Sequence, residues 1–152
     1  EAVAFEAHLA VLQDDDAGSA EHHFWKVERS DRTAHVARVV SSASPSIVFT
    51  RTRHGADRLA KQLAGAGVTA VALHGGRSQQ QRNRALKDFS SGRSQALVAT
   101  DVAARGLDID ELDIVIQADP PPDPKTYLHR AGRTARAGGR CPRACAVPTA
   151  AT

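Results

Sequence analysis

The stretch ALVATDVAARGLDI, residues 96–109, begins as a buried strand and ends in a crowd of polar groups. Its first five residues are aliphatic or β-branched, which is typical of a strand that is covered on both faces. Thr100, Asp101, Arg105 and Asp108 then follow in quick succession. Polar groups at the border of a core need partners, so the end of this strand is predicted to be part of a polar rim.

Similar apolar runs recur along the chain and alternate with helical patterns. The predicted strands cover residues 22–28, 46–50, 69–74, 95–100 and 112–118. Between the first three of them, apolar residues recur at the i, i+3, i+4 spacing of amphipathic helices. These residues are Val36, Val39, Val40, Ala56, Leu59, Ala60 and Leu63. The alternation predicts an α/β fold of three layers, in which helices flank a mainly parallel central sheet.

Length and composition are those of one globular domain. A chain of 152 residues, of which 41% are hydrophobic and 24% charged, suffices for a single core. The net charge of +3 conceals an acidic leader: the first 20 residues hold five acids and no Lys or Arg, which leaves 20 bases against 12 acids in the remainder. This basic body favours a phosphate-bearing partner, although a solvated basic surface would have the same composition.

Cysteine usage and hydropathy exclude several classes of protein. Cys141 and Cys145 are the only cysteines, and they lack a second Cys or His pair at zinc-site spacing, so we expect no structural metal. No segment resembles a signal peptide, and no apolar run approaches the roughly 20 residues that span a bilayer. We expect a cytoplasmic protein that makes no membrane contact.

Polar residues also follow the strands at 46–50 and 69–74, in the segments FTRTR (49–53) and LHGGRSQQQR (73–82). Ligands of parallel sheets bind beyond the carboxyl ends of the strands. Backbone N–H groups at Gly75 could hold a phosphate, and Ser78 is placed to cap a helix. A turn followed by a helix cap explains the glycine and the serine equally well, but it accounts less simply for Gln79 and Arg82.

The segment TYLHRAGRTARAGG, residues 126–139, carries three arginines at three-residue spacing. If the segment is helical, Arg130, Arg133 and Arg136 share about one face, with His129 one turn before Arg133. Their mutual repulsion is relieved either by an external polyanion or by acids from elsewhere in the fold. The chain has no GxxxxGK[ST] loop and no paired carboxylates for Mg²⁺, so it is not expected to hold ATP alone.

Four segments together resemble the second RecA-like domain of DEAD-box RNA helicases, and the resemblance suggests a bacterial type. They are IVFTRTR (47–53), LHGGRSQQQR (73–82), LVATDVAARGLDI (97–109) and YLHRAGRTARAG (127–138), in the order and spacing of the family's motifs. The resemblance covers residues 22–140 and implies a three-layer RecA-like fold. It also implies ATP-dependent RNA unwinding by the full-length protein, with ATP and Mg²⁺ held mainly by an N-terminal RecA-like domain. The chain alone is expected to be inactive.

The resemblance also assigns roles to residues. Arg133 and Arg136 resemble arginine fingers, which reach the γ-phosphate across the cleft and act in catalysis. Asp108, with Gly106 beside it, resembles the contact to the nucleotide ribose, and His129 resembles a contact of domain closure. The RNA-backbone contacts of the family correspond to Arg53, Gly75, Gln79, Arg82, Thr100 and Arg105. Contacts to phosphate and sugar imply recognition that is independent of RNA sequence.

The resemblance is weakest at the two ends of the chain. We expect residues 1–21 to be a linker or a flexible N-terminal leader, and residues 141–152 to be an irregular tail or a displaced last strand. Pro142 and Pro148 underlie the second expectation, because proline removes a donor from a strand ladder. Within the last motif, Ala131 and Ala135 replace an isoleucine and a glycine that the family usually has.

Two other functions fit the same residues. One is a domain of a related superfamily 2 DNA helicase, because the residues of these motifs do not distinguish RNA from DNA. The other is a non-catalytic RNA-binding module. Arg133 and Arg136 argue against this second alternative, since a pure binding module needs no ligands for a γ-phosphate.

Overall fold

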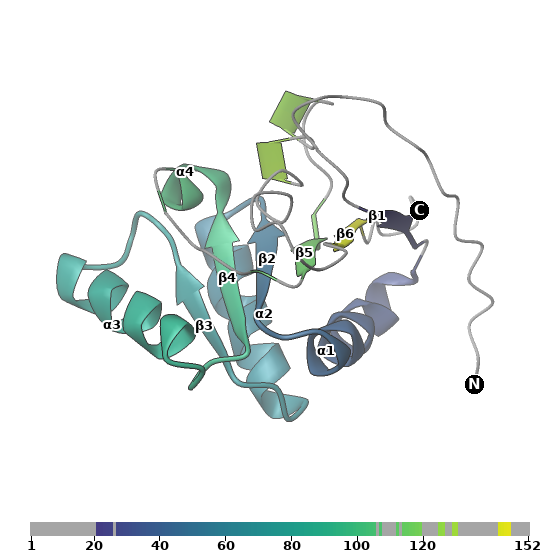
Figure 1. Cartoon of the computed structure of the whole chain (residues 1–152), viewed down its shortest axis with the longest axis horizontal. Helices are drawn as coiled ribbons and strands as arrows, with labels where there is room; N and C mark the ends of the chain where they lie inside the picture. Colours follow the sequence, from purple (N-terminus) through teal and green to yellow (C-terminus); the bar gives the residue numbers. More distant parts are fainter. Residues whose placement is uncertain are drawn as a thin grey trace.

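Six parallel strands form one sheet in a computed structural model of the chain (Figure 1). The structure describes residues 21–25, 27–105, 107, 112, 114–119, 125–126, 129–130 and 143–146. The strands are β1 (Glu21–Phe24), β2 (Ser46–Thr50), β3 (Ala70–Leu73), β4 (Ala96–Thr100), β5 (Ile114–Gln117) and β6 (Arg143–Ala146). Their order in the sheet is β1-β6-β5-β2-β4-β3, so β3 lies at one edge and β2 between β4 and β5.

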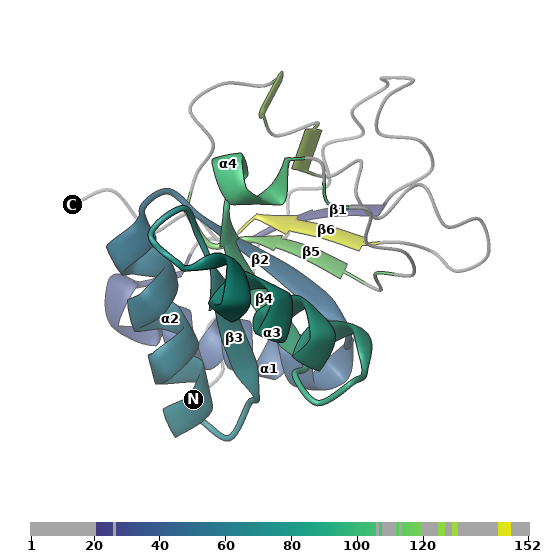
Figure 2. The same cartoon turned by 90° about the vertical axis from the view of Figure 1, so that its left-hand side faces the viewer.

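Helices cover both faces of the sheet. A 3-10 turn, η1 (Arg29–Asp31), precedes α1 (Arg32–Ser42); the other helices are α2 (Arg53–Gly65), α3 (Gln79–Ser90) and α4 (Asp101–Ala104). Side chains of α1 and α2 form one buried cluster with Val48 and Val98, whereas α3 and α4 form another with Ile47 and Leu97. Because neighbouring residues of a strand point to opposite faces, these two clusters are the two cores of a three-layer fold (Figure 2).

Local sequence explains where the main helices begin. The Ser78 hydroxyl accepts a hydrogen bond from the Gln81 N–H at 3.2 Å, and the Gln81 side chain accepts one from the Ser78 N–H at 2.9 Å. This capping box satisfies backbone donors that the first turn of α3 would otherwise leave unpaired. At α2, the Thr52 hydroxyl accepts from the Gly55 N–H at 2.9 Å. The two hydrogen bonds between Ser78 and Gln81 confirm the cap that was predicted at Ser78.

The predicted fold class is confirmed, and the predicted strands differ from the observed ones by only a few residues at their ends. At the C-terminal end, β6 pairs in parallel with both β5 and β1, with Arg143 opposite Ile114 and Glu21. Four residues of the segment expected to be irregular or displaced thus form a strand inside the sheet. The boundaries at residues 21 and 141 stay predictions. In the described part of the chain, no helix is both long and apolar enough to cross a bilayer.

A buried histidine lies on the inner face of α1. His35 is only 5% exposed, and its ring packs edge-on against Trp25 with 5.0 Å between the centroids. Burial, followed by the positive charge of Arg38, lowers the pKa of His35 below its ordinary value of 6.5. The fold therefore favours the neutral imidazole, whereas the unfolded chain takes up a proton more readily.

We expect the folded chain to lose stability as the pH falls below about 6.5, because the unfolded state then binds more protons at His35 than the folded state does. His35→Phe keeps an aromatic ring beside Trp25 but cannot titrate. Urea unfolding at pH 7.5 and 5.5 should therefore show a smaller loss of unfolding free energy in the variant than in the wild type. Equal losses in the two proteins would assign the acid sensitivity to other groups.

Candidate nucleic-acid interface

The carboxyl ends of β2, β4 and β3 lie side by side at one end of the sheet. Thr50 is opposite Thr100 in the β2–β4 pair, and Leu73 is opposite Ala99 in the β3–β4 pair. Since all three strands are parallel, the segments that follow them leave the sheet at the same end. This register brings together the three polar strand ends that lie far apart in the sequence.

Two residues predicted to bind RNA are in contact at this end. Arg53 is the first residue of α2, and Gly75 follows β3; both are exposed. A Cβ atom added at Gly75 would lie 3.4 Å from a terminal nitrogen of the Arg53 guanidinium and 3.7 Å from its central carbon. These are ordinary contact distances, so the guanidinium lies beside the exposed turn at Gly75, and a phosphate could contact both groups.

A buried histidine fixes the turn that holds Gly75. The Gly76 N–H donates to Nδ1 of His74 at 3.0 Å, so Nδ1 is an acceptor and the proton of the neutral ring is on Nε2. Nε2 lies 2.9 Å from the Asp57 carboxylate, which also accepts from Arg77 at 2.9 Å. His74 is 5% exposed. Sequence reasoning missed this network, although a histidine between a strand and two glycines was a visible signal.

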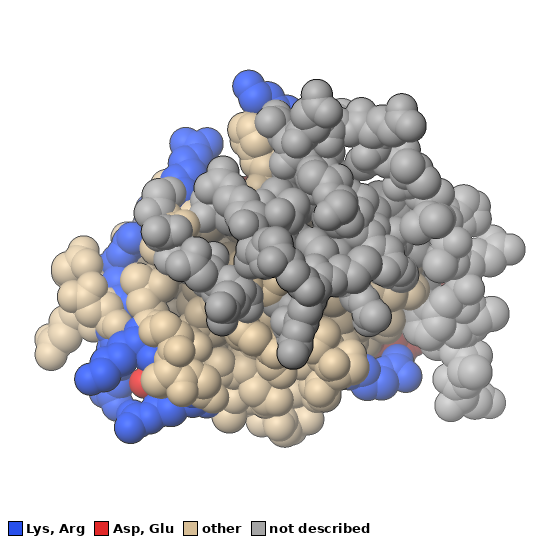
Figure 3. Space-filling view, in the orientation of Figure 1, with Lys and Arg blue, Asp and Glu red and all other residues tan. Residues whose placement is uncertain are grey.

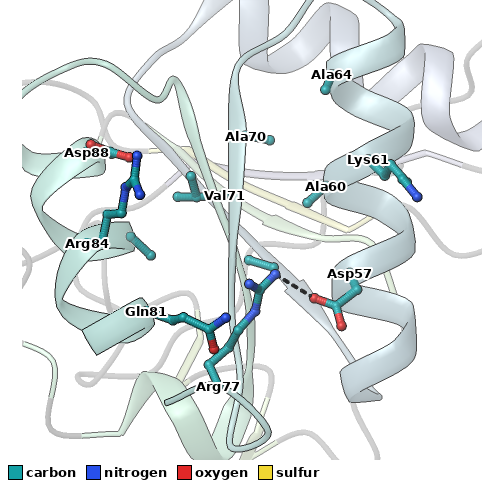
Figure 4. Close-up of a pocket in the computed structure, with 12 residues that line it drawn as sticks. Asp57, Ala60, Lys61, Ala64, Ala70, Val71, Arg77, Gln81, Arg84 and Asp88 are labelled. Carbon is teal, nitrogen blue, oxygen red and sulfur yellow. Dashed lines mark hydrogen bonds and ion pairs between the residues drawn. The ribbon is translucent and has the colours of Figure 1, made fainter. Parts of the chain in front are cut away.

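Asp57 is charged in this network. Partial burial raises the pKa of its carboxyl, but the hydrogen bonds from His74 and Arg77 and the positive charge of Arg77 lower that pKa by more, so it lies below its usual value. Figure 4 shows the Arg77 guanidinium reaching across to Asp57 on α2. The network thus ties the turn after β3 to α2, the helix that begins with Arg53.

The other predicted RNA contacts lie around this pair. Gln79 is exposed on the first turn of α3 and donates to the Asn83 side chain at 2.9 Å. Arg82 is half-buried on the same helix, and Arg105 is exposed immediately after α4. Thr100 ends β4 and is only 8% exposed, so a ligand could reach it only at the end of the sheet. Lys and Arg side chains gather on the side of the molecule where α3 lies (Figure 3).

Arg130 is a structural residue, so of the two alternatives left open by the sequence, an acid from elsewhere in the fold rather than an external polyanion compensates this arginine. Its guanidinium is 2% exposed and forms two hydrogen bonds of 2.7 Å to the Asp101 carboxylate. It also donates to the Gln117 side chain at 3.3 Å and to the Asp119 carbonyl at 3.0 Å, and it lies 5.2 Å from the centre of the Phe49 ring. The Asp101 carboxylate neutralises this arginine, and the oxygens of Gln117 and Asp119 accept its other hydrogen bonds.

A further carboxylate at the same end of the sheet was not predicted. Asp119 follows β5, and its carboxylate accepts from the Arg32 guanidinium and from the Arg51 N–H, each at 2.8 Å. It therefore joins the start of α1 to the segment between β2 and α2. The sequence signal was its position after an apolar strand, which is the position that also marked Thr100 and Asp101.

Four predicted site residues, Gly106, Asp108, Arg133 and Arg136, lie outside the described residues. His129 is described and exposed, and it is adjacent in the chain to the buried Arg130. The described residues therefore include the whole predicted RNA-binding set but only His129 of the predicted nucleotide-binding set.

Comparison with known proteins identifies relatives over most of the described chain. The model of the family described as "Helicase conserved C-terminal domain" matches residues 31–138. The ATP-dependent rRNA helicase RRP3 of Kluyveromyces lactis is 55% identical over 93 residues, which are 61% of this chain and 19% of that protein. DEAD-box ATP-dependent RNA helicase 7 of Spinacia oleracea is 46% identical over 110 residues, which are 72% of this chain and 16% of that protein.

Solved structures show the same similarity in three dimensions. The Escherichia coli DEAD-box protein SrmB, solved bound to regulator of ribonuclease activity A, matches with a TM-score of 0.77 and 39% identity, over 85% of this chain and 77% of that one. The C-terminal domain of the DEAD-box protein Dbp5 matches with a TM-score of 0.72 and 32% identity, over 88% and 78% of the two chains.

These comparisons bear on the length of the related proteins and on the expected bacterial type. The chain spans less than a fifth of the length of either curated relative, so those proteins contain much more than the region that it matches. The bacterial type expected from the sequence is not supported, since both of these relatives are eukaryotic.

Proposed function

Because the chain belongs to the family of helicase C-terminal domains found in DEAD-box proteins, we propose that it is the second RecA-like domain of an ATP-dependent RNA helicase. One observation carries the proposal beyond family membership. The ends of β2, β3 and β4 lie side by side, and they carry Arg53 in contact with Gly75, together with Thr100 and Arg105. A row of cations and exposed backbone at the end of a parallel sheet suits a nucleic-acid backbone.

In the proposed RNA site, the groups that meet the ligand are cations, a backbone turn and a hydroxyl. Arg53, Arg82 and Arg105 would contact phosphates, the turn at Gly75 would approach the sugar-phosphate chain, and Gln79 and Thr100 would donate hydrogen bonds. None of these groups needs a base edge, so binding should not depend on RNA sequence. His74 and Asp57 would hold the turn in place without touching RNA.

The proposed nucleotide site uses Gly106, Asp108, His129, Arg133 and Arg136 of this chain. ATP would supply the phosphoryl group that is cleaved, with Mg²⁺ and most of the phosphate contacts provided by the N-terminal RecA-like domain. The donor set suits an anionic ligand by its chemistry, because it contains two arginines and a histidine. The arginines would act on the γ-phosphate when the two domains close.

The ion pair between Asp101 and Arg130 supports a coupling of the two proposed sites. Asp101 directly follows Thr100 of the RNA site, and Arg130 precedes Arg133 by one helical turn in the sequence. Two hydrogen bonds of 2.7 Å join these residues. A shift of the β4 end on RNA binding would therefore be passed to the segment that leads to the arginine fingers.

We expect the chain to bind single-stranded RNA weakly, with an affinity that falls steeply with salt. If Arg53, Arg82 and Arg105 each neutralise one RNA phosphate, the slope of log affinity against log salt concentration should be near −2, because each contact on a single strand contributes about −0.7. Fluorescence anisotropy with labelled homopolymer RNA at several salt concentrations measures this slope. Arg82→Ala should make the slope shallower by about 0.7.

Two controls separate this proposal from its alternatives. Arg93→Ala removes an exposed cation whose side chain is 80% exposed and lies beyond the C-terminal end of α3, so it should leave the slope unchanged. A DNA strand of the same sequence should bind more weakly if 2′-hydroxyls are contacted. A flat salt response would argue against the strand ends as the binding site, and equal affinity for DNA would favour a DNA helicase. A cytoplasmic location also stays a prediction.

A further inference from the structure

The outer edge of β3 carries backbone groups that no described residue pairs. The Thr69 carbonyl accepts from the Ala96 N–H at 3.1 Å and so faces β4. Successive residues of a strand direct their backbone groups to opposite edges, so the N–H and C=O of Ala70 and Ala72 face outward. β3 is the last strand of the sheet on this side. The donor and acceptor of half-exposed Ala70 are therefore open along the edge, and those of Ala72 line the same pocket although the residue is only 6% exposed.

A groove of about 610 Å³ runs along this edge. It is lined by β3 and by α2 and α3, which pack on opposite faces of the sheet, so the groove straddles the edge itself (Figure 4). Five of its lining residues are alanines, namely Ala60, Ala64, Ala70, Ala72 and Ala85. These short side chains leave space beside the strand, where longer ones would cover the open backbone groups.

The charges along the groove favour an acidic occupant. Three cations, Lys61, Arg77 and Arg84, line it against two acids. Asp57 pairs with His74 and Arg77, whereas Asp88 has only a long contact of 3.9 Å with Arg93. Lys61 on α2 and Arg84 on α3 are exposed, and neither forms an ion pair with another described residue. Lys61 and Arg84 belong to the helices that form the two walls of the groove; in Figure 4 the Lys61 side chain points away from β3, so it would reach an occupant in another rotamer. The two walls thus each offer one available cation.

We propose that the groove binds an extended acidic segment of a partner protein, which adds to the sheet as a strand beside β3. An added strand presents alternating N–H and C=O groups that match those of Ala70 and Ala72. An RNA backbone has 2′-hydroxyl donors, but they do not alternate with carbonyl acceptors as the groups of a strand do, so RNA fits this edge less well than a peptide. Successive side chains of the added strand point to opposite faces of the sheet, and therefore to opposite walls of the groove. Acids at odd-numbered positions would face one of Lys61 and Arg84, and acids at even-numbered positions would face the other. The inference does not depend on the proposed RNA and ATP sites.

The test uses the 152-residue chain as bait for a phage-displayed library of random peptides, followed by anisotropy of the selected peptides with a fluorescent label. We expect selected peptides to be acidic and rich in β-branched residues. Ala70→Pro should weaken their binding about fivefold or more, the loss expected for one hydrogen bond of about 1 kcal/mol. Proline is tolerated at the first residue of an edge strand, and it removes only the outward donor.

Two further variants control the test. Ala70→Val adds similar bulk to the groove but keeps the donor, so it should bind the peptides more tightly than Ala70→Pro does. Lys61→Glu with Arg84→Glu changes only exposed side chains and should weaken acidic peptides by about fivefold or more. Selection of no peptides, selection of basic ones, or binding that is unaffected by Ala70→Pro and by charge reversal would overturn the proposal. Loss of single-stranded RNA binding in the charge-reversed chain would assign the groove to RNA instead.

Discussion

Replacing Arg133 with alanine, in the protein that joins this chain to its N-terminal RecA-like domain, is expected to lower kcat for ATP hydrolysis by about 100-fold or more. An arginine finger meets the γ-phosphate only after the domains close, so its loss removes an interaction that strengthens in the transition state. Arg136→Ala should behave alike. Nucleotide affinity of the open form should change little. Steady-state ATP turnover at saturating RNA and equilibrium binding of a labelled nucleotide measure the two quantities.

A lysine substitution separates the contribution of the charge of Arg133 to kcat from that of its planar guanidinium. Arg133→Lys keeps the charge but loses the planar fork, so it should restore only part of kcat. Arg82→Ala serves as the control, because weaker RNA binding lowers turnover in a way that high RNA concentrations overcome. If saturating RNA rescued Arg133→Ala, or if that variant did not fold, Arg133 would be an RNA-binding or structural residue rather than a finger.

Removing the carboxylate of Asp101 should have the largest effect on stability. Arg130 is 2% exposed and depends on Asp101 for two hydrogen bonds, so Asp101→Ala leaves a buried guanidinium without its counter-charge. Breaking a fully buried ion pair in this way costs about 3–5 kcal/mol of unfolding free energy, and we expect a loss at the lower end of this range because the Asp101 side chain is 33% exposed. Urea unfolding followed by far-ultraviolet circular dichroism measures the loss.

Asp88→Ala is the matched control, because its pair with Arg93 is long, at 3.9 Å, and the arginine is 80% exposed. That pair should contribute less than about 1 kcal/mol. Replacing Arg130 with methionine in the Asp101→Ala background removes the uncompensated charge and should recover part of the stability. A loss at Asp101 no greater than the loss at Asp88 would contradict the structural role assigned to Arg130.

Much of this molecule is determined by its sequence alone, because the signals involved are local. Apolar runs of four or five residues mark β2, β3, β4 and β5, and the i, i+3, i+4 spacing marks α1 and α2. The cap of α3 lies within a few residues of Ser78. Even the polar rim could be predicted, since strands that are parallel must end together.

The partners of the buried polar groups could not be predicted in this way. Arg130 stands in a run of evenly spaced arginines, and nothing near it in the sequence distinguishes it from Arg133 or Arg136. Its main partner, Asp101, is 29 residues away in the chain. The Asp57 carboxylate is likewise 17 residues from His74.

Strand order decided these contacts. Because β2 lies between β4 and β5, Asp101 after β4 and Asp119 after β5 flank the end of β2, and Arg130 contacts both of them across the Phe49 ring. The same order leaves β3 at the edge, with its groove open between α2 and α3. Periodicity reports only which face of an element is buried, whereas the order of strands depends on how all the elements pack together. Only the tertiary structure could therefore show that Arg130 is a structural residue.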